Sequence, residues 1–124
     1  MQARVEKITW LSESAKEAEV VLSSQEASLI AFCHPCELEF GTLVTSPIHV
    51  FGATKVMLAQ GDAHSIVHAG GQVHLVTGNL VDLERQLVTS CGFVFTLDDH
   101  LPGGLATGDT ISFRCRRLDI WWRA

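Results

Sequence analysis

Residues 108–122 constrain the fold more than any other stretch of this sequence. After a Gly-Asp turn, apolar and polar residues alternate over residues 111–115, which is typical of a half-buried strand. The alternation resumes over residues 118–122, but it is shifted by one position. A one-residue slip turns the buried side chains of a strand to solvent, so we expect a β-bulge or a sharp bend near Arg116.

The rest of the chain shows the same short-period alternation and almost no helical periodicity. Runs rich in β-branched and aromatic residues are separated by Gly, Pro, Ser and Asp, which favour turns. Strands are expected at residues 3–11, 19–32 (a hairpin), 37–40, 48–51, 54–58 (separated from the previous strand by Gly52), 72–83, 87–97 and 110–122.

These strands predict an all-β fold in a single domain spanning residues 1–124. Gly78 and Gly92 interrupt the two longest strands, and such interruptions let a sheet coil strongly enough to close. We therefore expect a small closed or partly open Greek-key barrel that is OB-like in type, with a β-sandwich as the alternative.

Charge is distributed unevenly along the chain. The formal net charge is −5, which argues against a general nucleic-acid-binding protein. Residues 1–39 contain seven glutamates and only three cationic side chains, whereas residues 114–124 contain four arginines and one aspartate. One interpretation is that the two ends lie together, within one chain or across a subunit contact, and partly neutralise each other. The other is a basic face for an anionic ligand.

Nothing in the sequence indicates export or membrane insertion. The N-terminus lacks the apolar segment of a signal peptide, and no apolar run reaches the length of a membrane-spanning helix. The four cysteines are irregularly spaced, which suits reduced thiols in a cytoplasmic protein.

Cys33-x-x-Cys36 is the most suggestive short motif. A redox dithiol needs its first cysteine at a helix N-terminus, and the alternating residues that follow do not predict a helix. A zinc site needs two more ligands, and the spacing does not select them among six histidines and two isolated cysteines. Cys33 and Cys36 are thus weak metal or redox candidates, and we expect no cofactor.

Other polar clusters have ordinary explanations. His64 and His68 precede His74, but the segment between the first two is strand-like, so we expect exposed loop side chains. Asp98-Asp99-His100 follows a strand and reads as a turn. No nucleophile elbow, phosphate loop or dinucleotide-binding pattern occurs, so we do not expect an enzyme.

The C-terminal strand is the expected working surface. Arginine beside tryptophan is enriched at protein interfaces, so we expect a binding or assembly module that contacts a second copy of itself or another protein. The same chemistry suits single-stranded nucleic acid, which is the first alternative. A zinc- or thiol-dependent function through the two clustered cysteines is the second. The candidate contact residues are Arg114, Arg116, Arg117, Trp121 and Arg123.

Overall fold

The computed structural model describes residues 1–121, which form twelve strands and no helix. Their side chains alternate between buried and exposed in most strands, as the sequence pattern predicts. The strands are β1 (Ala3–Ser12), β2 (Glu17–Ser23), β3 (Ser28–Cys33), β4 (Leu43–Val44), β5 (Ile48–Phe51), β6 (Thr54–Leu58), β7 (Ser65–His68), β8 (His74–Asp82), β9 (Leu87–Ser90), β10 (Phe93–Leu97), β11 (Thr110–Cys115) and β12 (Arg117–Ile120).

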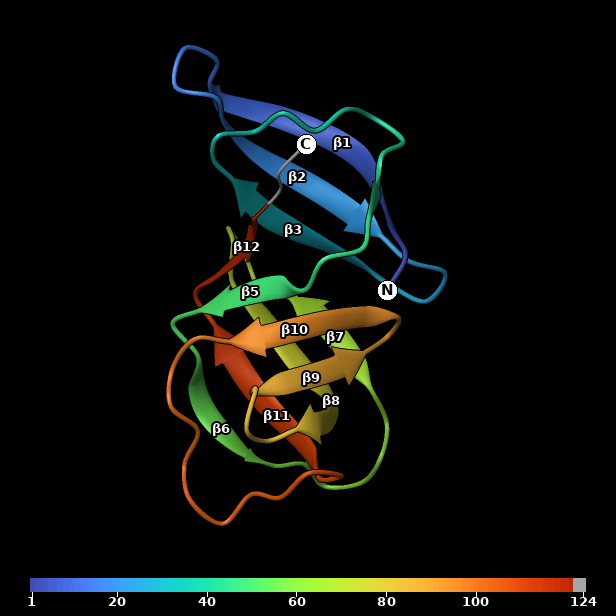
Figure 1. Cartoon of the computed structure of the whole chain (residues 1–124), viewed down its shortest axis with the longest axis vertical. Coiled ribbons are helices and arrows are strands. Elements are labelled where there is room, and N and C mark those ends of the chain that lie inside the picture. The colour runs from blue at the N-terminus through green and yellow to red at the C-terminus, as the bar shows by residue number, and fades with distance from the viewer. Residues whose placement is uncertain (122–124) are drawn as a thin grey trace.

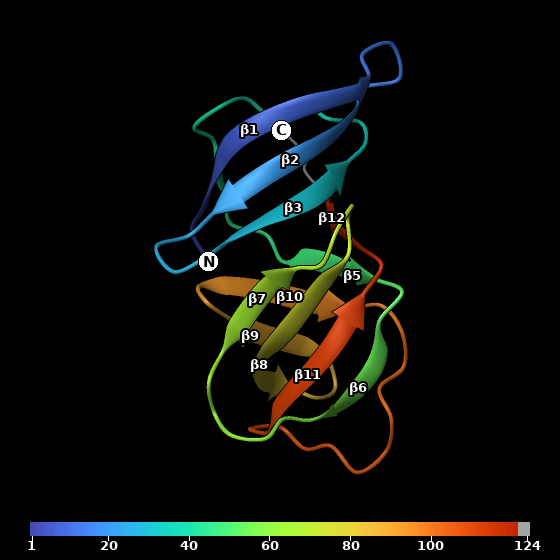
Figure 2. The same ribbon diagram turned by 180° about the vertical axis from the view of Figure 1, so that it is seen from behind.

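All twelve strands belong to one sheet, in the order β4-β1-β2-β3-β12-β5-β10-β9-β8-β11-β6, with β7 attached to β8. The sheet is not closed, and this all-β arrangement is consistent with an open barrel or a β-sandwich. Figures 1 and 2 show two groups of strands, with β1, β2 and β3 at one end and β5 to β11 at the other. Strand β12 lies between β3 and β5 and joins the groups.

The predicted irregularity near Arg116 is confirmed. β11 ends at Cys115, and β12 begins at Arg117, so a bend separates the two phases of the alternation. The bend also changes partners: β11 pairs with β8 and β6, whereas β12 pairs with β5 and, in parallel, with β3. The C-terminal segment therefore contributes to both groups of strands. Trp122, the last residue of the predicted strand, lies outside the described residues.

Gly52 separates two strands within residues 48–58, as predicted, and the chain bends there. Gly52 has a φ of 69°, a conformation that suits glycine, and β6 continues from β5 after this bend. β5 pairs with β10 and β12, but β6 pairs with β11 at the end of the sheet order. β5 and β6 are thus adjacent in the chain but far apart in the strand order of the sheet. The sheet between them therefore has to curve so that both of its ends meet this segment.

The prediction of one long strand over residues 87–97 was wrong. Cys91 and Gly92 both have positive φ, at 50° and 82°, and form a two-residue turn. β9 and β10 are consequently an antiparallel hairpin, with Phe93 opposite Ser90. Phe93 and Phe95 are fully buried, and their rings are tilted by 33° with 6.1 Å between the centroids, so β10 lies in the core.

Residues 37–40 do not form the predicted strand, although burial alternates over residues 36–39; Phe40 is 74% exposed. Cys36 and Leu38 are buried, and Glu37 and Glu39 are exposed. The segment makes no strand ladder; the Cys36 N–H instead donates to the carbonyl of Lys16 at 2.7 Å. Alternating burial therefore arises here from a loop that packs against the β1–β2–β3 sheet.

His74 connects the two groups of strands through a buried polar contact. The Ile30 N–H on β3 donates to His74 Nε2 at 3.2 Å, and His74 Nδ1 lies 3.1 Å from the Gln72 carbonyl oxygen, to which it donates. The His74 side chain is fully buried at the start of β8. Burial lowers its pKa below the ordinary value of 6.5, which keeps the ring neutral so that Nε2 can accept.

Candidate functional site

The predicted contact residues of the C-terminal segment lie on two surfaces. Arg114 is exposed on β11 and lines a pocket with residues of three other strands. Arg117 and Trp121 lie beside residues of β3 and β5 instead. Arg116 is exposed at the bend between β11 and β12. Arg123 lies outside the described residues.

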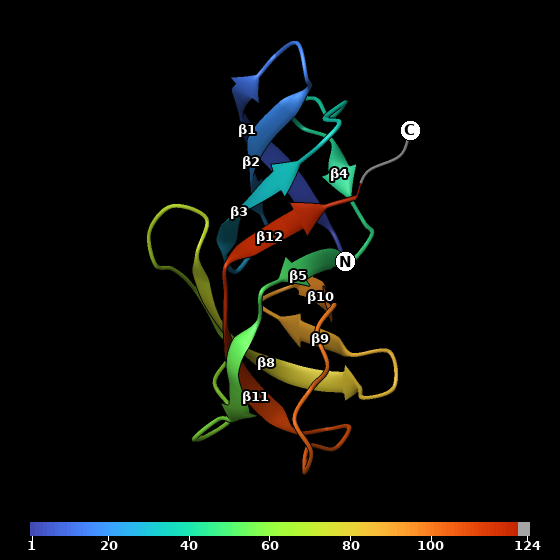
Figure 3. The ribbon, with the colours of Figure 1, turned by 90° about the vertical axis from the view of Figure 1, so that its left-hand side faces the viewer.

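The first surface, here called the aromatic–arginine face, comprises Phe32, His49, Phe51, Arg117 and Trp121. It forms because β12 alternates: Leu118 and Ile120 are buried, which directs the side chains between and after them to the opposite side. β3, β12 and β5 lie side by side in Figure 3.

Arg117 is held in place on this face. Its Nε and Nη2 atoms donate to the two carboxylate oxygens of Asp119 at 2.6 and 3.0 Å, a bidentate pair. Its guanidinium carbon also lies 4.6 Å from the ring centroid of Phe32 and 5.1 Å from that of Phe51. Arg117 therefore fixes two aromatic rings, and its charge is largely neutralised by Asp119.

Trp121 is the most prominent apolar group of the face. It is 62% exposed, and its ring stacks on His49 with 3.5 Å between centroids and 16° between planes. His49 Nδ1 lies 3.3 Å from Asp98 Oδ1, which orients the imidazole ring. Phe51, which is 47% exposed, adds a second ring on the same strand as His49. The indole is thus positioned on one side and open to solvent on the other.

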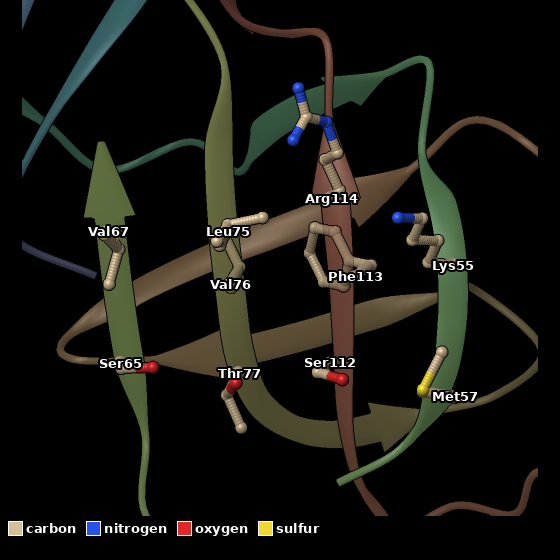
Figure 4. Close-up of a pocket in the computed structure, with 10 residues that line it drawn as sticks. All are labelled: Lys55, Met57, Ser65, Val67, Leu75, Val76, Thr77, Ser112, Phe113 and Arg114. Carbon is tan, nitrogen blue, oxygen red and sulfur yellow. The ribbon is translucent and has the colours of Figure 1, made fainter. Parts of the chain in front are cut away.

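The second surface is a pocket of about 490 Å³ on the outer side of β7, β8, β11 and β6. Of its lining residues, Val76 and Phe113 are buried and the others are exposed or half-buried. Figure 4 shows Lys55 and Arg114 at the same end of the pocket, on neighbouring strands. The complete lining is Lys55, Met57, Ser65, Val67, Leu75, Val76, Thr77, Ser112, Phe113 and Arg114.

Sequence reasoning identified Arg114 but not the pocket around it. The lining residues lie up to 59 positions apart in the chain, from Lys55 to Arg114, and no motif marks Lys55 or Leu75. Only the strand order brings these residues together. The pocket could have been predicted only from the pairing of β11 with β6 and β8. Hydrophobic periodicity predicts the strands but not which strands pair.

Cys33 and Cys36 are both buried, and neither forms a disulfide. Burial, together with the neighbouring Cys36, raises the pKa of the Cys33 thiol to about 12. At neutral pH this thiol is protonated, which is the opposite of the lowered pKa that a reactive or metal-binding thiolate needs. Within residues 1–121, no three or more His, Cys, Asp or Glu side chains gather in a way that could hold a metal ion.

The three central histidines differ in environment. His64 and His68 are exposed, as expected, although His68 lies on strand β7 rather than in a loop. His68 Nε2 lies 2.6 Å from the carbonyl oxygen of Gly71, and its ring centroid lies 5.3 Å from that of His74. These contacts close the turn between β7 and β8, so their evident role is structural.

Comparisons with known proteins provide no relative for this chain: no family model, no curated protein and no solved structure matches it. In the described part of the chain there is also no helix long and apolar enough to cross a membrane.

Proposed function

We propose that this protein is a non-enzymatic binding and assembly module that self-associates through the aromatic–arginine face. The observation that carries the proposal is the exposed Trp121 indole, which His49 and Asp98 hold in position. A rigid aromatic side chain binds with a small loss of conformational entropy. Tryptophan and arginine are also the residues most enriched among those that dominate binding energy.

Charge complementarity favours a second copy of the chain as the partner. Arg114 and Arg116 are exposed at the C-terminal end, and the first 39 residues carry seven glutamates. Most of these glutamates are exposed on the β1–β2–β3 side of the molecule or in the loops next to it. No ion pair joins these acidic residues to the C-terminal arginines within residues 1–121. Both charges therefore stay available for contact between copies.

Sedimentation velocity over a dilution series tests this proposal. We expect a species of twice 13.5 kDa that dissociates on dilution and on addition of salt. Trp121→Ala should weaken association about 30-fold or more, the effect of losing a dominant interface residue. Leu83→Ala is the control, because Leu83 is 38% exposed in the turn between β8 and β9, on neither the aromatic–arginine face nor the acidic β1–β2–β3 side. A wild-type protein that is monomeric at all accessible concentrations would refute self-association.

Single-stranded nucleic acid is the second candidate occupant, and one observation favours it. Trp121 and Phe51 offer exposed rings for base stacking, and Arg114 and Arg116 offer cationic groups for the phosphates. Fluorescence anisotropy with a labelled oligonucleotide at low salt checks this candidate. We expect salt-dependent affinity that falls when both arginines are replaced by alanine. An absence of binding at low salt would eliminate it.

The remaining parts of the proposal concern fold type and location. We propose an OB-like, partly open Greek-key barrel, supported by the bent β5–β6 segment that pairs with strands at both ends of the group β5–β11. The four free cysteines suit a cytoplasmic location. A thiol-dependent function receives no such support, because the pKa of Cys33 is raised rather than lowered.

A further inference from the structure

The pocket between β7, β8, β11 and β6 lies outside the aromatic–arginine face and shares only Arg114 with the groups proposed for self-association. We infer that this pocket binds a small amphiphilic anion, a molecule with an apolar body and one carboxylate. Four observations carry the inference: the strand register, a β-bulge at Lys55, the local charge and the pocket volume.

The strand register places apolar and cationic side chains in one row across three strands. Val67 on β7 is paired with Leu75 on β8, and Leu75 is paired with Arg114 on β11. Residues paired directly across a ladder project to the same face of a sheet. Val67 and Leu75 are about half exposed, at 50% and 42%. An apolar body lying along this row would end beside the guanidinium of Arg114.

A second row runs across the other end of the pocket. Ser65 is paired with Thr77, Thr77 with Ser112, and Ser112 with Met57 on β6. Figure 4 shows three hydroxyl-bearing side chains in this row and the Met57 thioether at its end, 52% exposed. The pocket is therefore polar but uncharged at this end, and its cations are confined to the opposite end.

A β-bulge brings a second cation to Arg114. Ser112 and Arg114 are two residues apart on β11, but their partners on β6, Met57 and Thr54, are three residues apart. The extra residue is accommodated where Lys55 adopts a φ of 54°, a left-handed conformation that costs energy for a residue with a side chain. Bulges commonly redirect side chains beside functional sites. Here the Lys55 side chain extends from β6 toward β11 (Figure 4).

The positive charge at the end of the pocket where Lys55 and Arg114 lie favours an anionic ligand. Lys55 and Arg114 are exposed, and neither forms an ion pair within residues 1–121. The pocket lining contains no aspartate or glutamate. Two adjacent cations repel each other, and a carboxylate between them removes this repulsion and forms charge-assisted hydrogen bonds.

The dimensions of the pocket favour a small molecule. Its volume of about 490 Å³ falls within the usual range of small-molecule sites, about 300–1,000 Å³. Val76 and Phe113, which are buried, lie between the two rows on β8 and β11. The ligand class is therefore a molecule with a short alkyl or aryl body whose single carboxylate lies between Lys55 and Arg114.

Methyl NMR provides a direct test, because the chain has only two methionines. Met57 lines the pocket, and Met1 lies elsewhere, with its sulfur 3.1 Å from the Val94 nitrogen. In protein labelled at the methionine methyl groups, decanoate below its micellar concentration should shift the Met57 signal saturably and leave the Met1 signal unchanged. Decanol, which has the same chain without the charge, should bind at least about tenfold more weakly. Equal affinity for both, or no shift of the Met57 signal, would overturn the inference.

Two variants separate recognition of the anion from support of the fold. Arg114→Gln should weaken decanoate binding about tenfold or more, and Arg85→Gln, an exposed arginine in the β8–β9 turn, should not. Lys55→Gly removes the charge but also relieves the positive φ, so it should weaken binding while raising the melting temperature. Wild-type affinity in Arg114→Gln and Lys55→Gly would overturn the inference. Association with phosphatidylglycerol vesicles without decanoate binding would also overturn the inference, because Lys55 and Arg114 would then bind a membrane surface rather than a small molecule.

Discussion

Protonation of His74 should destabilise the protein below pH 6.5. The ring is fully buried, its Nε2 accepts a hydrogen bond from the Ile30 N–H, and its pKa is lowered chiefly by burial. In the unfolded chain the same ring titrates near 6.5. The unfolded state therefore takes up a proton first as pH falls, and stability is lost from pH 6.5 down to the lowered pKa of the folded state.

The size of this effect follows from proton linkage. A single group that is protonated only in the unfolded state changes the free energy of unfolding by about 1.4 kcal/mol per pH unit. Between pH 7.5 and 5.5, with an unfolded pKa of 6.5, the loss is therefore at most about 1.4 kcal/mol. A protonated Nε2 would also lose the hydrogen bond from Ile30, which links β3 to β8.

Urea denaturation at pH 7.5, 6.5 and 5.5 measures this loss. His74→Gln retains an acceptor for the Ile30 N–H but cannot titrate; it should be less stable at pH 7.5 by about 1–3 kcal/mol, with a weaker dependence on pH. His100→Gln, which changes an exposed histidine, is the control and should keep the wild-type dependence. The reasoning is refuted if His74→Gln and the wild type lose equal stability between pH 7.5 and 5.5.

Two further predictions concern packing and thiol chemistry. A Cβ atom on Gly78 would overlap the Thr89 carbonyl oxygen, so Gly78→Ala should destabilise the β8–β9 pair by about 1–3 kcal/mol or more, as measured by urea denaturation. Gly103→Ala, where a Cβ atom meets nothing within 4 Å, is the control and should have little effect. Because the pKa of Cys33 is raised from 9.0 to about 12, its thiolate fraction at pH 8 is about a thousandfold smaller than that of an ordinary thiol. Mass spectrometry after brief alkylation should therefore find Cys91, which is partly exposed, modified well before Cys33.

Local patterns predicted the features that depend only on neighbouring residues. The phase shift near Arg116 and the bend at Gly52 are both visible in the sequence, because strand alternation has a period of two and glycine permits the bend. The same reasoning failed over residues 87–97. Apolar residues continue on both sides of Cys91–Gly92, and the pair lacks the Asn or Asp that usually marks a two-residue turn.

The candidate sites depended on long-range pairing that the sequence does not encode locally. Lys55 lies next to Arg114 only because β6 pairs with β11 across a bulge. In the same way, Phe32 and Phe51 contact Arg117 only because β12 pairs with β3 on one side and β5 on the other. The arginines of the C-terminal segment were predicted as candidates, but their separation into two surfaces was not.

The position of β12 explains why a binding surface and the junction of the molecule coincide. Its four residues fill the space between the two groups of strands, with Leu118 and Ile120 buried and Arg117 on the opposite side. A partner that covers Trp121 and Phe51 would therefore contact the segment on which the junction depends and stabilise the folded state by mass action. A ligand between Lys55 and Arg114 would instead contact β6 and β11, on one side of that junction. The two surfaces are thus built on different strands, although a single C-terminal segment contributes to both.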